Sequence, residues 1–420
     1  MKKPLAIIEI SSTKIKLLVG CMVNETPIVV YHTSRDIPGV FVDGKLVNRE
    51  KLVQALTSFK SIRDDSARME ININEVNLVL PVNGLVIYQS RKTTTTVNAD
   101  GAKVSEIDIE NVIHQVRNEK IPDNQEIIEV APAAFYSDDG TKFANANALI
   151  GSVRARSISV EAFLHCLPKG TTAAFNSILQ DAGFRVLRNS IQPYAEVSLF
   201  ALDKSLPDSY FLVDIGANNS NVSLIGKYKP YAGTSFYLAG EELTSLIATE
   251  FGIPREKAEM LKKKYGYDER ECSYTPALIR SNESTHGHDF YQKDLNLVIE
   301  HYFEEEYLPR LDATISSLES KYGNSLAAFP LVITGGASLL FGIEKFFIKH
   351  YPSKPIYLGH PHIVGGRDPS FVSLLGMAVN ANSFKGNLSD HEEGYSKVRR
   401  EEKVKDEKKK KRSSLEEDTL

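Results

Sequence analysis

Strand-like and helix-like patterns alternate along most of the chain. Short apolar runs of the kind that form buried strands occur at residues 5–10, 15–22, 76–80, 85–90, 210–215, 222–225 and 331–334. Apolar positions repeated every three or four residues predict helices at residues 49–59, 106–116, 170–182, 240–251, 255–265, 293–320 and 342–350. This alternation predicts a mixed α/β architecture.

Residues 82–160 differ from the rest of the chain in the order of their predicted strands and helices. They contain strand patterns, a run of threonines at 93–96, one helix pattern starting near Glu106, and further strand patterns. We expect an α+β subdomain inserted into a larger α/β domain.

One pattern occurs twice, about 205 residues apart. Three apolar residues, an acid, Ile, a small or polar turn and a second apolar strand occupy residues 6–15 and again residues 211–222. The acids are Glu9 and Asp214, and a carboxylate in an apolar strand is costly unless it is paired, hydrogen-bonded or close to a cation. Turns of small residues expose backbone N–H groups that suit phosphate oxygens. Either hairpin alone matches an ordinary strand end, but two that face each other would hold nucleotide phosphates and Mg²⁺.

A third segment, residues 330–343, is a buried strand pattern that ends in Gly335 and Gly336 before a helix pattern. Two glycines let the main chain approach a flat ligand such as adenine closely. The same residues also match a plain strand-to-helix connection.

Composition narrows the possible functions. The 420 residues suggest two or three domains. With 50 Lys and Arg against 54 Asp and Glu, the chain has no global positive field for binding nucleic acid. Cys21, Cys166 and Cys272 lack the spacing of a zinc site or disulfide framework. There is no run of about 18 apolar residues, so any membrane contact is expected to be peripheral.

The segment 385–420 holds 11 Lys and Arg, 10 Asp and Glu, and few apolar residues. It cannot bury enough apolar surface to offset the entropy of ordering, so we expect a disordered, charged tail. The basic run 408–412 fits a solvated charge run, or a transient contact with anionic lipid worth about 1 kcal/mol per cation.

Strand–acid–turn twice, followed by strand–Gly-Gly–helix, is the pattern of the actin/Hsp70/sugar-kinase ATPase superfamily. Within it the chain resembles the FtsA family of bacterial cell-division proteins over residues 5–384. Further segments that fit that family are residues 38–48, 105–113, 127–132, 182–184 and 256–266. The resemblance implies an α/β, actin/Hsp70-like two-lobed fold with an inserted, SHS2-like α+β subdomain.

The resemblance also implies a division into domains. Lobe 1 would comprise residues 1–81, 161–205 and 355–384, and the inserted subdomain residues 82–160. Lobe 2 would comprise residues 206–238 and 300–354, with a small subdomain at 239–299 and the tail at 385–420.

Carried over by position, the resemblance assigns ATP or ADP and Mg²⁺ to the cleft between the lobes. Asp214 would lie near the Mg²⁺ and the attacked water, and Glu9 would take the place of the first hairpin's acid. The residues expected along the phosphates are Ser11, Ser12, Thr13, Lys14, Gly216, Ala217, Asn218, Asn219 and Gly240. The ribose would contact Glu259 and Lys262, which also match an exposed salt bridge, and the adenine would lie against Gly335, Gly336 and Ala337.

The sequence departs from the family pattern in both turns. Glu9 is one methylene longer than the usual Asp, and Ser11 replaces a glycine. Ala217, Asn218 and Asn219 stand where the second turn is glycine-rich, although Asn tolerates positive φ and could hold a similar turn. We therefore expect at most a weak ATPase, with weakened nucleotide binding.

The resemblance implies a scaffold of the division machinery that self-associates, contacts later division proteins through the inserted subdomain and binds the C-terminal tail of FtsZ. Lys293 and Arg310, on one predicted helix, could attract that acidic tail, but they also match ordinary exposed charges with a solvating role. The place expected is the inner face of the cytoplasmic membrane at the division site. The last 30 residues show no apolar stripe, so membrane contact is expected to be weak or indirect.

Three alternatives remain open. One is a pilus-assembly actin-like protein that binds the tail of a membrane partner. The second is a scaffold of the same fold that binds no nucleotide, and the third is a sugar or acetate kinase, for which no substrate-site acid is evident.

Overall fold

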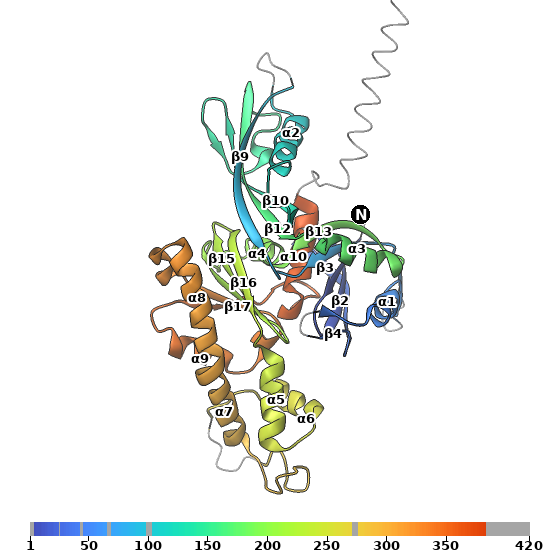
Figure 1. The fold of residues 1–420 in the computed structure, drawn as a ribbon, viewed down its shortest axis with the longest axis vertical. Helices are drawn as coiled ribbons and strands as arrows, with labels where there is room; N and C mark the ends of the chain where they lie inside the picture. Colours follow the sequence, from blue (N-terminus) through green and yellow to red (C-terminus); the bar gives the residue numbers. More distant parts are fainter. Residues whose placement is uncertain are drawn as a thin grey trace, which may run out of the picture.

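The computed structural model describes residues 4–24, 26–42, 45–64, 69–97, 103–270 and 276–383. The predicted tail and Cys272 lie outside these residues, as do parts of the segment 38–48. The chain forms two lobes, each built on a five-stranded sheet. In Figure 1 the inserted subdomain projects from one end of the molecule, and helices α5, α6 and α7 lie at the other.

The first sheet has the strand order β13–β8–β1–β2–β3. Its strands are β1 (Leu5–Ile10), β2 (Lys14–Val23), β3 (Thr26–Asp36), β8 (Glu75–Leu80) and β13 (Arg185–Ile191). Helices α1 (Arg49–Thr57) and α3 (Thr171–Asp181) bury leucine and isoleucine side chains against it. Two small hairpins, β4 (Phe41–Val42) with β5 (Lys45–Leu46) and β6 (Ser61–Asp64) with β7 (Met69–Asn72), lie nearby in sequence.

The second sheet repeats the first. Its order is β16–β15–β14–β17–β18, where the strands are β14 (Tyr210–Ile215), β15 (Ser220–Gly226), β16 (Lys229–Phe236), β17 (Leu331–Thr334) and β18 (Ile356–Leu358). In each sheet the central strand, β1 or β14, pairs antiparallel with the next strand and parallel with a later one. The duplicated sequence pattern is therefore a duplicated sheet topology.

Helices α4 (Gln192–Phe200) and α10 (Val372–Ser383) lie between the two sheets (Figure 1). One apolar cluster contains Ala195 and Phe200 of α4, Leu374 of α10, Ile7 of β1 and Leu212 of β14. Apolar residues on both faces of these helices predict burial on two sides, and the two lobes share this core.

The inserted subdomain is a four-stranded sheet in the order β11–β10–β12–β9. Its strands are β9 (Val86–Thr95), β10 (Gln125–Ser137), β11 (Lys142–Phe143) and β12 (Ser157–Pro168). Helix α2 (Glu106–Arg117) starts at a capping box between Ser105 and Asp108 and packs on the sheet over a separate apolar core, with the 3₁₀ turn η1 (Ala146–Ala148) at its margin.

The far end of lobe 2 is helical. It comprises α5 (Gly240–Phe251), α6 (Arg255–Lys264), α7 (Gln292–His301), the π-helix η2 (Tyr302–Tyr307), α8 (Leu308–Tyr322) and α9 (Ile343–His350). Short 3₁₀ turns are η3 (Asn324–Ala328), η4 (Gly336–Leu339) and η5 (Pro369–Phe371). Among the described residues, no helix has the length and apolarity needed to cross a membrane.

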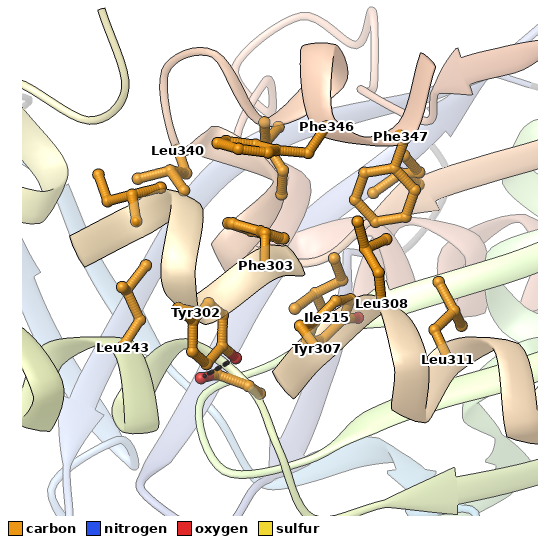
Figure 2. Packing of buried hydrophobic residues seen from close by; sticks show 14 of the residues in the cluster. Ile215, Leu243, Tyr302, Phe303, Tyr307, Leu308, Leu311, Leu340, Phe346 and Phe347 are labelled. Atoms are coloured by element: carbon orange, nitrogen blue, oxygen red, sulfur yellow. Dashed lines mark hydrogen bonds between the residues drawn. The ribbon is translucent and has the colours of Figure 1, made fainter. Parts of the chain in front are cut away.

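The sequence predicted a single helix at 293–320, and the structure corrects this with a π turn. Pro309 has no N–H for the α-helical bond to residue 305, which interrupts the regular ladder. The wider turn brings the rings of Tyr302 and Tyr307 to 5.9 Å. Figure 2 shows Phe303 facing Phe346 of α9 and Tyr307 near Phe347, with Tyr302 on the opposite side of the turn.

Candidate functional site

The two acids of the repeated pattern occupy equivalent places in the two sheets. Glu9, in β1, is paired across the hairpin with Lys16, and Asp214, in β14, is paired with Asn221. Both acids are buried, with 9% and 7% of their surface exposed. Each therefore needs polar partners, and each has them.

Glu9 is held by lobe 1 and by α10. Lys16 Nζ donates to Glu9 Oε1 at 2.8 Å and to the backbone oxygen of Ser370 at 2.7 Å. The hydroxyl of Ser373, in α10, donates to the other carboxylate oxygen. These donors engage both oxygens of Glu9.

Asp214 is held by α4 and by its own hairpin. Gln192 Nε2 donates to Asp214 Oδ2, and Asn221 Nδ2 donates to the same oxygen at 3.3 Å. Gly335 lies against the other oxygen so closely that a Cβ there would overlap Oδ1. The glycine is required at this place, because its φ is also +88°.

A third buried acid completes the cluster. Glu196, in α4, accepts from Gln192 Nε2 at 2.9 Å and is 3% exposed. Burial raises the pKa of Glu196 well above its usual range, and the charges of Asp214 and Glu9 add to the rise. Among these neighbours the opposing cation is Lys16.

The same charges act on Lys16 and Asp214. Burial raises the pKa of Asp214 and Glu9 adds to it, while Lys16 opposes the rise. Burial would lower the pKa of Lys16, but the charge of Glu9, with Asp214 and Glu196, raises it. The two hairpins thus place their acids within one electrostatic cluster, in which Lys16 supplies the ammonium group among the described residues.

Beside this cluster, the start of α5 meets the second turn. The backbone N–H groups of Gly240 and Glu241 donate to the carbonyl oxygens of Gly216, at 3.2 Å, and Ala217, at 2.8 Å. A Cβ at Gly240 would be 3.4 Å from Lys262 Nζ and 3.6 Å from the Cβ of Ala337. Segments far apart in sequence therefore converge here.

Lys262 and Glu259 form a partly buried group on α6. Lys262 Nζ pairs with Glu259 Oε2 at 2.5 Å and donates to the carbonyl oxygen of Gly240 at 2.7 Å and to Thr244 Oγ1 at 2.6 Å. Burial opposes ionisation of Glu259, but Lys262 outweighs it and lowers the pKa of the carboxyl to about 2. The pair joins α6 to the N-terminus of α5.

The first turn is not joined to this group by any described contact. Ser11 closes its own hairpin, donating from N to the oxygen of Lys14 at 2.9 Å, and Lys14 Nζ pairs with Asp36 at 3.2 Å. The oxygen of Thr13 accepts from Ile37 N at 2.8 Å. Ser12, at the tip of the same turn, is half-buried.

The second turn differs from its expected conformation. The sequence allowed Asn218 and Asn219 to hold a glycine-like turn through positive φ, but neither residue has a positive φ. Instead, Gly216 N donates to the oxygen of Asn219 at 3.1 Å, which closes the turn with ordinary backbone angles. Gly336 opens the 3₁₀ turn η4 directly after Gly335.

The residues expected to attract a partner are also separated. Lys293 is in α7 and Arg310 is in α8, with the π turn between them, so they do not share one regular α-helix.

Comparison with known proteins identifies the family. The family model described as "Cell division protein FtsA" matches residues 211–376, and the model described as "SHS2 domain inserted in FTSA" matches residues 87–153. The cell division protein FtsA of Streptococcus pneumoniae is 22% identical over 91% of this chain and 80% of its own length. That of Bacillus subtilis is 22% identical over 88% of this chain and 81% of its own length. The chain is a divergent member of the FtsA family.

Two solved structures share the fold of this FtsA-family chain. A chain of the PilM–PilN type IV pilus biogenesis complex superposes with a TM-score of 0.54 at 16% identity, covering 90% of this chain and 99% of that one. MreB 5 of Spiroplasma citri bound to AMPPNP superposes with a TM-score of 0.52 at 13% identity, covering 93% and 99%. The predicted fold class, actin-like with an inserted SHS2 subdomain, is confirmed.

On the side where the base is expected, Gly335 cannot carry a side chain because Asp214 and Ile215 lie against it, and Lys262 and Ala337 lie beside Gly240. The small residues among these are compatible with a flat ligand such as adenine. The phosphate side fits less well, because the N–H groups of Gly216, Gly240 and Glu241 are already bonded to backbone oxygens. Glu9 and Asp214 are suitable ligands for a divalent cation, but Lys16 already supplies positive charge there. Among the described residues, no three His, Cys, Asp or Glu side chains form a metal cluster.

Five residues of the acid cluster were not predicted: Lys16, Gln192, Glu196, Asn221 and Ser373. Two of them could have been predicted from the sequence, because Lys16 and Asn221 each come seven residues after the acid of their hairpin. The other three are on helices, and only the packing of α4 and α10 brings them to the acids.

Proposed function

We propose that this FtsA-type cell-division protein acts as a scaffold at the inner face of the cytoplasmic membrane at the division site. It self-associates, binds the C-terminal tail of FtsZ and connects that tail to the membrane, while the inserted subdomain contacts later division proteins. Similarity to the cell division protein FtsA of Streptococcus pneumoniae over 91% of this chain supports this role. The observation that carries the nucleotide part is the convergence of Gly216, Gly240, Lys262 and Gly335 beside Asp214.

ATP or ADP serves as a structural or switching ligand in this proposal. Gly335, Gly336 and Ala337 border the adenine, Glu259 and Lys262 reach the ribose, and Gly216, Ala217 and Gly240 follow the phosphates. Mg²⁺, if bound, would be held by Asp214 and Glu9 and would screen the phosphate charge. ATP hydrolysis is slow or absent in this proposal. Among the described residues, the first turn makes no contact with the Lys262 group, and the backbone N–H groups of Gly216, Gly240 and Glu241 are already bonded to carbonyl oxygens.

Thermal unfolding in millimolar Mg-ATP, Mg-ADP or Mg-GTP tests the ligand. We expect ATP or ADP to raise the unfolding temperature by several degrees, because a ligand that binds only the folded state stabilises it. Lys262→Met removes the proposed ribose contact and is expected to reduce the shift, while Lys204→Met, an exposed lysine in the loop after α4, leaves it intact. No shift with any adenine nucleotide would leave a scaffold that binds no nucleotide.

The FtsZ contact is proposed for the surface of α7 and α8. Lys293 and Arg310 would attract an acidic tail mainly through long-range charge, so charge reversal should weaken binding several-fold at low salt. Fluorescence anisotropy with a labelled FtsZ tail peptide compares Lys293→Glu and Arg310→Glu with Lys321→Glu, which reverses a charge at the far end of α8. Equal affinities for all three would place the FtsZ contact elsewhere. Binding of a pilus-partner tail in preference to the FtsZ tail would favour the pilus-assembly alternative.

Membrane linkage is proposed as weak or indirect. Cosedimentation of the full chain with anionic or neutral vesicles measures it, and electrostatic attachment is expected to disappear at high salt. Binding to neutral vesicles that persists in high salt would contradict an electrostatic attachment.

A further inference from the structure

A pocket of about 160 Å³ opens where the inserted subdomain meets the body of the molecule. Its walls include Glu129 of β10, Arg188 of β13, Tyr194 of α4, Lys229 of β16 and Asn380 of α10, with Asn145 from the loop before η1. It shares no lining residue with the proposed nucleotide site. A cavity of about 150 Å³ accepts benzene, so this pocket has room for a small molecule and not for a folded element of a partner.

The pocket is electropositive. Arg188 and Lys229 line it, and Glu129 is the carboxylate among its described lining residues. Arg117 lies close enough to interact with Glu129 and Arg188. Burial and the neighbouring charge of Arg188 lower the pKa of Arg117 to about 10, and the charge of Glu129 opposes this change. Three cations therefore surround one acid.

Lys229 makes no ion pair with a carboxylate among the described residues. Among the described residues, no carboxylate oxygen lies within 4.0 Å of its Nζ, which instead lies 5.5 Å from the centre of the Tyr194 ring. Burial lowers the pKa of Lys229, and Glu129 opposes this from a greater distance. Lys229 is half-buried, and an ammonium group partly removed from water without a paired anion is costly to the folded state.

The carboxylate of Glu129 interacts with residues other than Lys229. Ser190 Oγ donates to its Oε2 at 2.7 Å, and His165 Nδ1 lies 3.9 Å from the same oxygen. Arg188 donates from Nη1 to the backbone oxygen of Asn380 at 2.5 Å, which fixes its guanidinium at the pocket wall. The fixed groups leave Lys229 facing a polar space of limited size.

We infer that this pocket binds a small oxyanion of the phosphate type, with the ammonium group of Lys229 as its main charged ligand and Arg188 beside it. Lys229 belongs to the second lobe, Arg188 to the first and Glu129 to a strand that continues into the inserted subdomain. A bound anion therefore joins three parts of the chain, and its binding stabilises their arrangement.

Phosphorus-31 NMR and calorimetric titration of the full chain with inorganic phosphate, at constant ionic strength, test the site. We expect saturable binding that Lys229→Met weakens at least tenfold and Lys229→Arg changes only a few-fold. Lys204→Met and Lys262→Met should leave it unchanged, and hydrogen exchange in β10 should slow at saturation. Lys229→Met removes a desolvated charge, so it is expected to fold, which its circular dichroism checks.

Failure of phosphate to bind would overturn the inference. So would binding that is lost in Lys262→Met and kept in Lys229→Met, because the anion would then occupy the nucleotide site. A parallel titration with succinate tests whether the pocket prefers phosphate to a carboxylate. We expect succinate to bind more weakly than phosphate, and Lys229-dependent binding of succinate that is tighter than that of phosphate would also overturn the inference.

Discussion

At the scale of single residues, the acid cluster concentrates like charges in a buried place. Gln192 donates to Glu196 and to Asp214, so one amide bridges two carboxyl groups. Lys16 supplies one positive charge to a cluster that also includes Glu9. Like charges at short range in a buried site do not all ionise, and Glu196 is the acid that keeps its proton most strongly.

Replacing Glu196 tests this charge balance. The folded state keeps the Glu196 proton at pH values where the unfolded chain has lost it, so the free energy of unfolding falls as the pH rises above about 4.5. Glu196→Gln removes this dependence and should be more stable than the parent at pH 8 by about 1 to 3 kcal/mol. Urea unfolding between pH 5 and pH 8.5 measures it, with the exposed Glu250→Gln as the control. Parallel pH profiles for the parent and Glu196→Gln would show that Glu196 is ionised when folded.

Neighbouring glycines give a second test at this scale. Gly335 has φ +88° and its Cβ would overlap Asp214, whereas a Cβ at Gly336 would make an ordinary contact of 3.5 Å with Ser370. Gly335→Ala should cost about 2 kcal/mol or more, from the strained φ and the overlap, and should abolish any shift with ATP. Gly336→Ala should change stability by less than about 1 kcal/mol. Equal stability of the two variants would contradict the close approach at Gly335.

At the scale of elements, the crossing of α4 and α10 decides how the lobes meet. Gly376, in α10, lies so close to α4 that a Cβ would overlap the carbonyl oxygen of Ala195. A backbone oxygen cannot move aside as a flexible side chain can. The same crossing carries Ser373 to Glu9, so the helix contact and the acid cluster depend on one geometry.

Gly376→Ala tests that crossing. Alanine favours a helix over glycine by about 1 kcal/mol, yet we expect a net loss of about 2 to 3 kcal/mol because the helices must separate. Denaturant unfolding measures the loss, and Gly336→Ala, which also adds one methyl group, is the control. Unchanged or increased stability of Gly376→Ala would mean that the two helices have room between them.

At the scale of the whole molecule, the two lobes share a hydrophobic core, and the inserted subdomain has a separate one. The cluster around α4 and α10 contains residues of both five-stranded sheets, whereas the inserted subdomain has an apolar cluster of its own. We therefore expect the two lobes to unfold together and the inserted subdomain to open with greater independence.

Hydrogen exchange followed by mass spectrometry tests this division. Leu374→Ala, at a fully buried site of the shared core, should cost about 2 to 5 kcal/mol and speed exchange at least 30-fold in β1 and in β14. Val112→Ala, fully buried in the inserted subdomain, should speed exchange there and leave β1 and β14 unchanged. Faster exchange in only one lobe of Leu374→Ala would show that the lobes unfold separately.

Local patterns explain which parts of the fold were predictable. The strands at 5–10, 210–215 and 331–334 have the predicted bounds, because each is a short apolar run ended by turn residues. The positions of Lys16 and Asn221 could have been inferred from the repeat, since the residue seven after each acid faces it across the antiparallel hairpin. The π turn was missed because the apolar positions repeated every three or four residues continue through it. Only the backbone hydrogen bonds change there, because Pro309 has no N–H to donate.

The amino-acid sequence by itself determined the two acid-bearing hairpins, the strand that ends at Gly335 and Gly336, the inserted subdomain and the family. Each of these was recognised from patterns within continuous stretches of residues. Tertiary structure alone decided which side chains surround the acids. Gln192, Glu196 and Ser373 lie on helices whose hydrophobic pattern specifies only that they are buried, and burial does not specify a neighbour. The crossing of α4 with α10 supplies the neighbour, and with it the charge of the site.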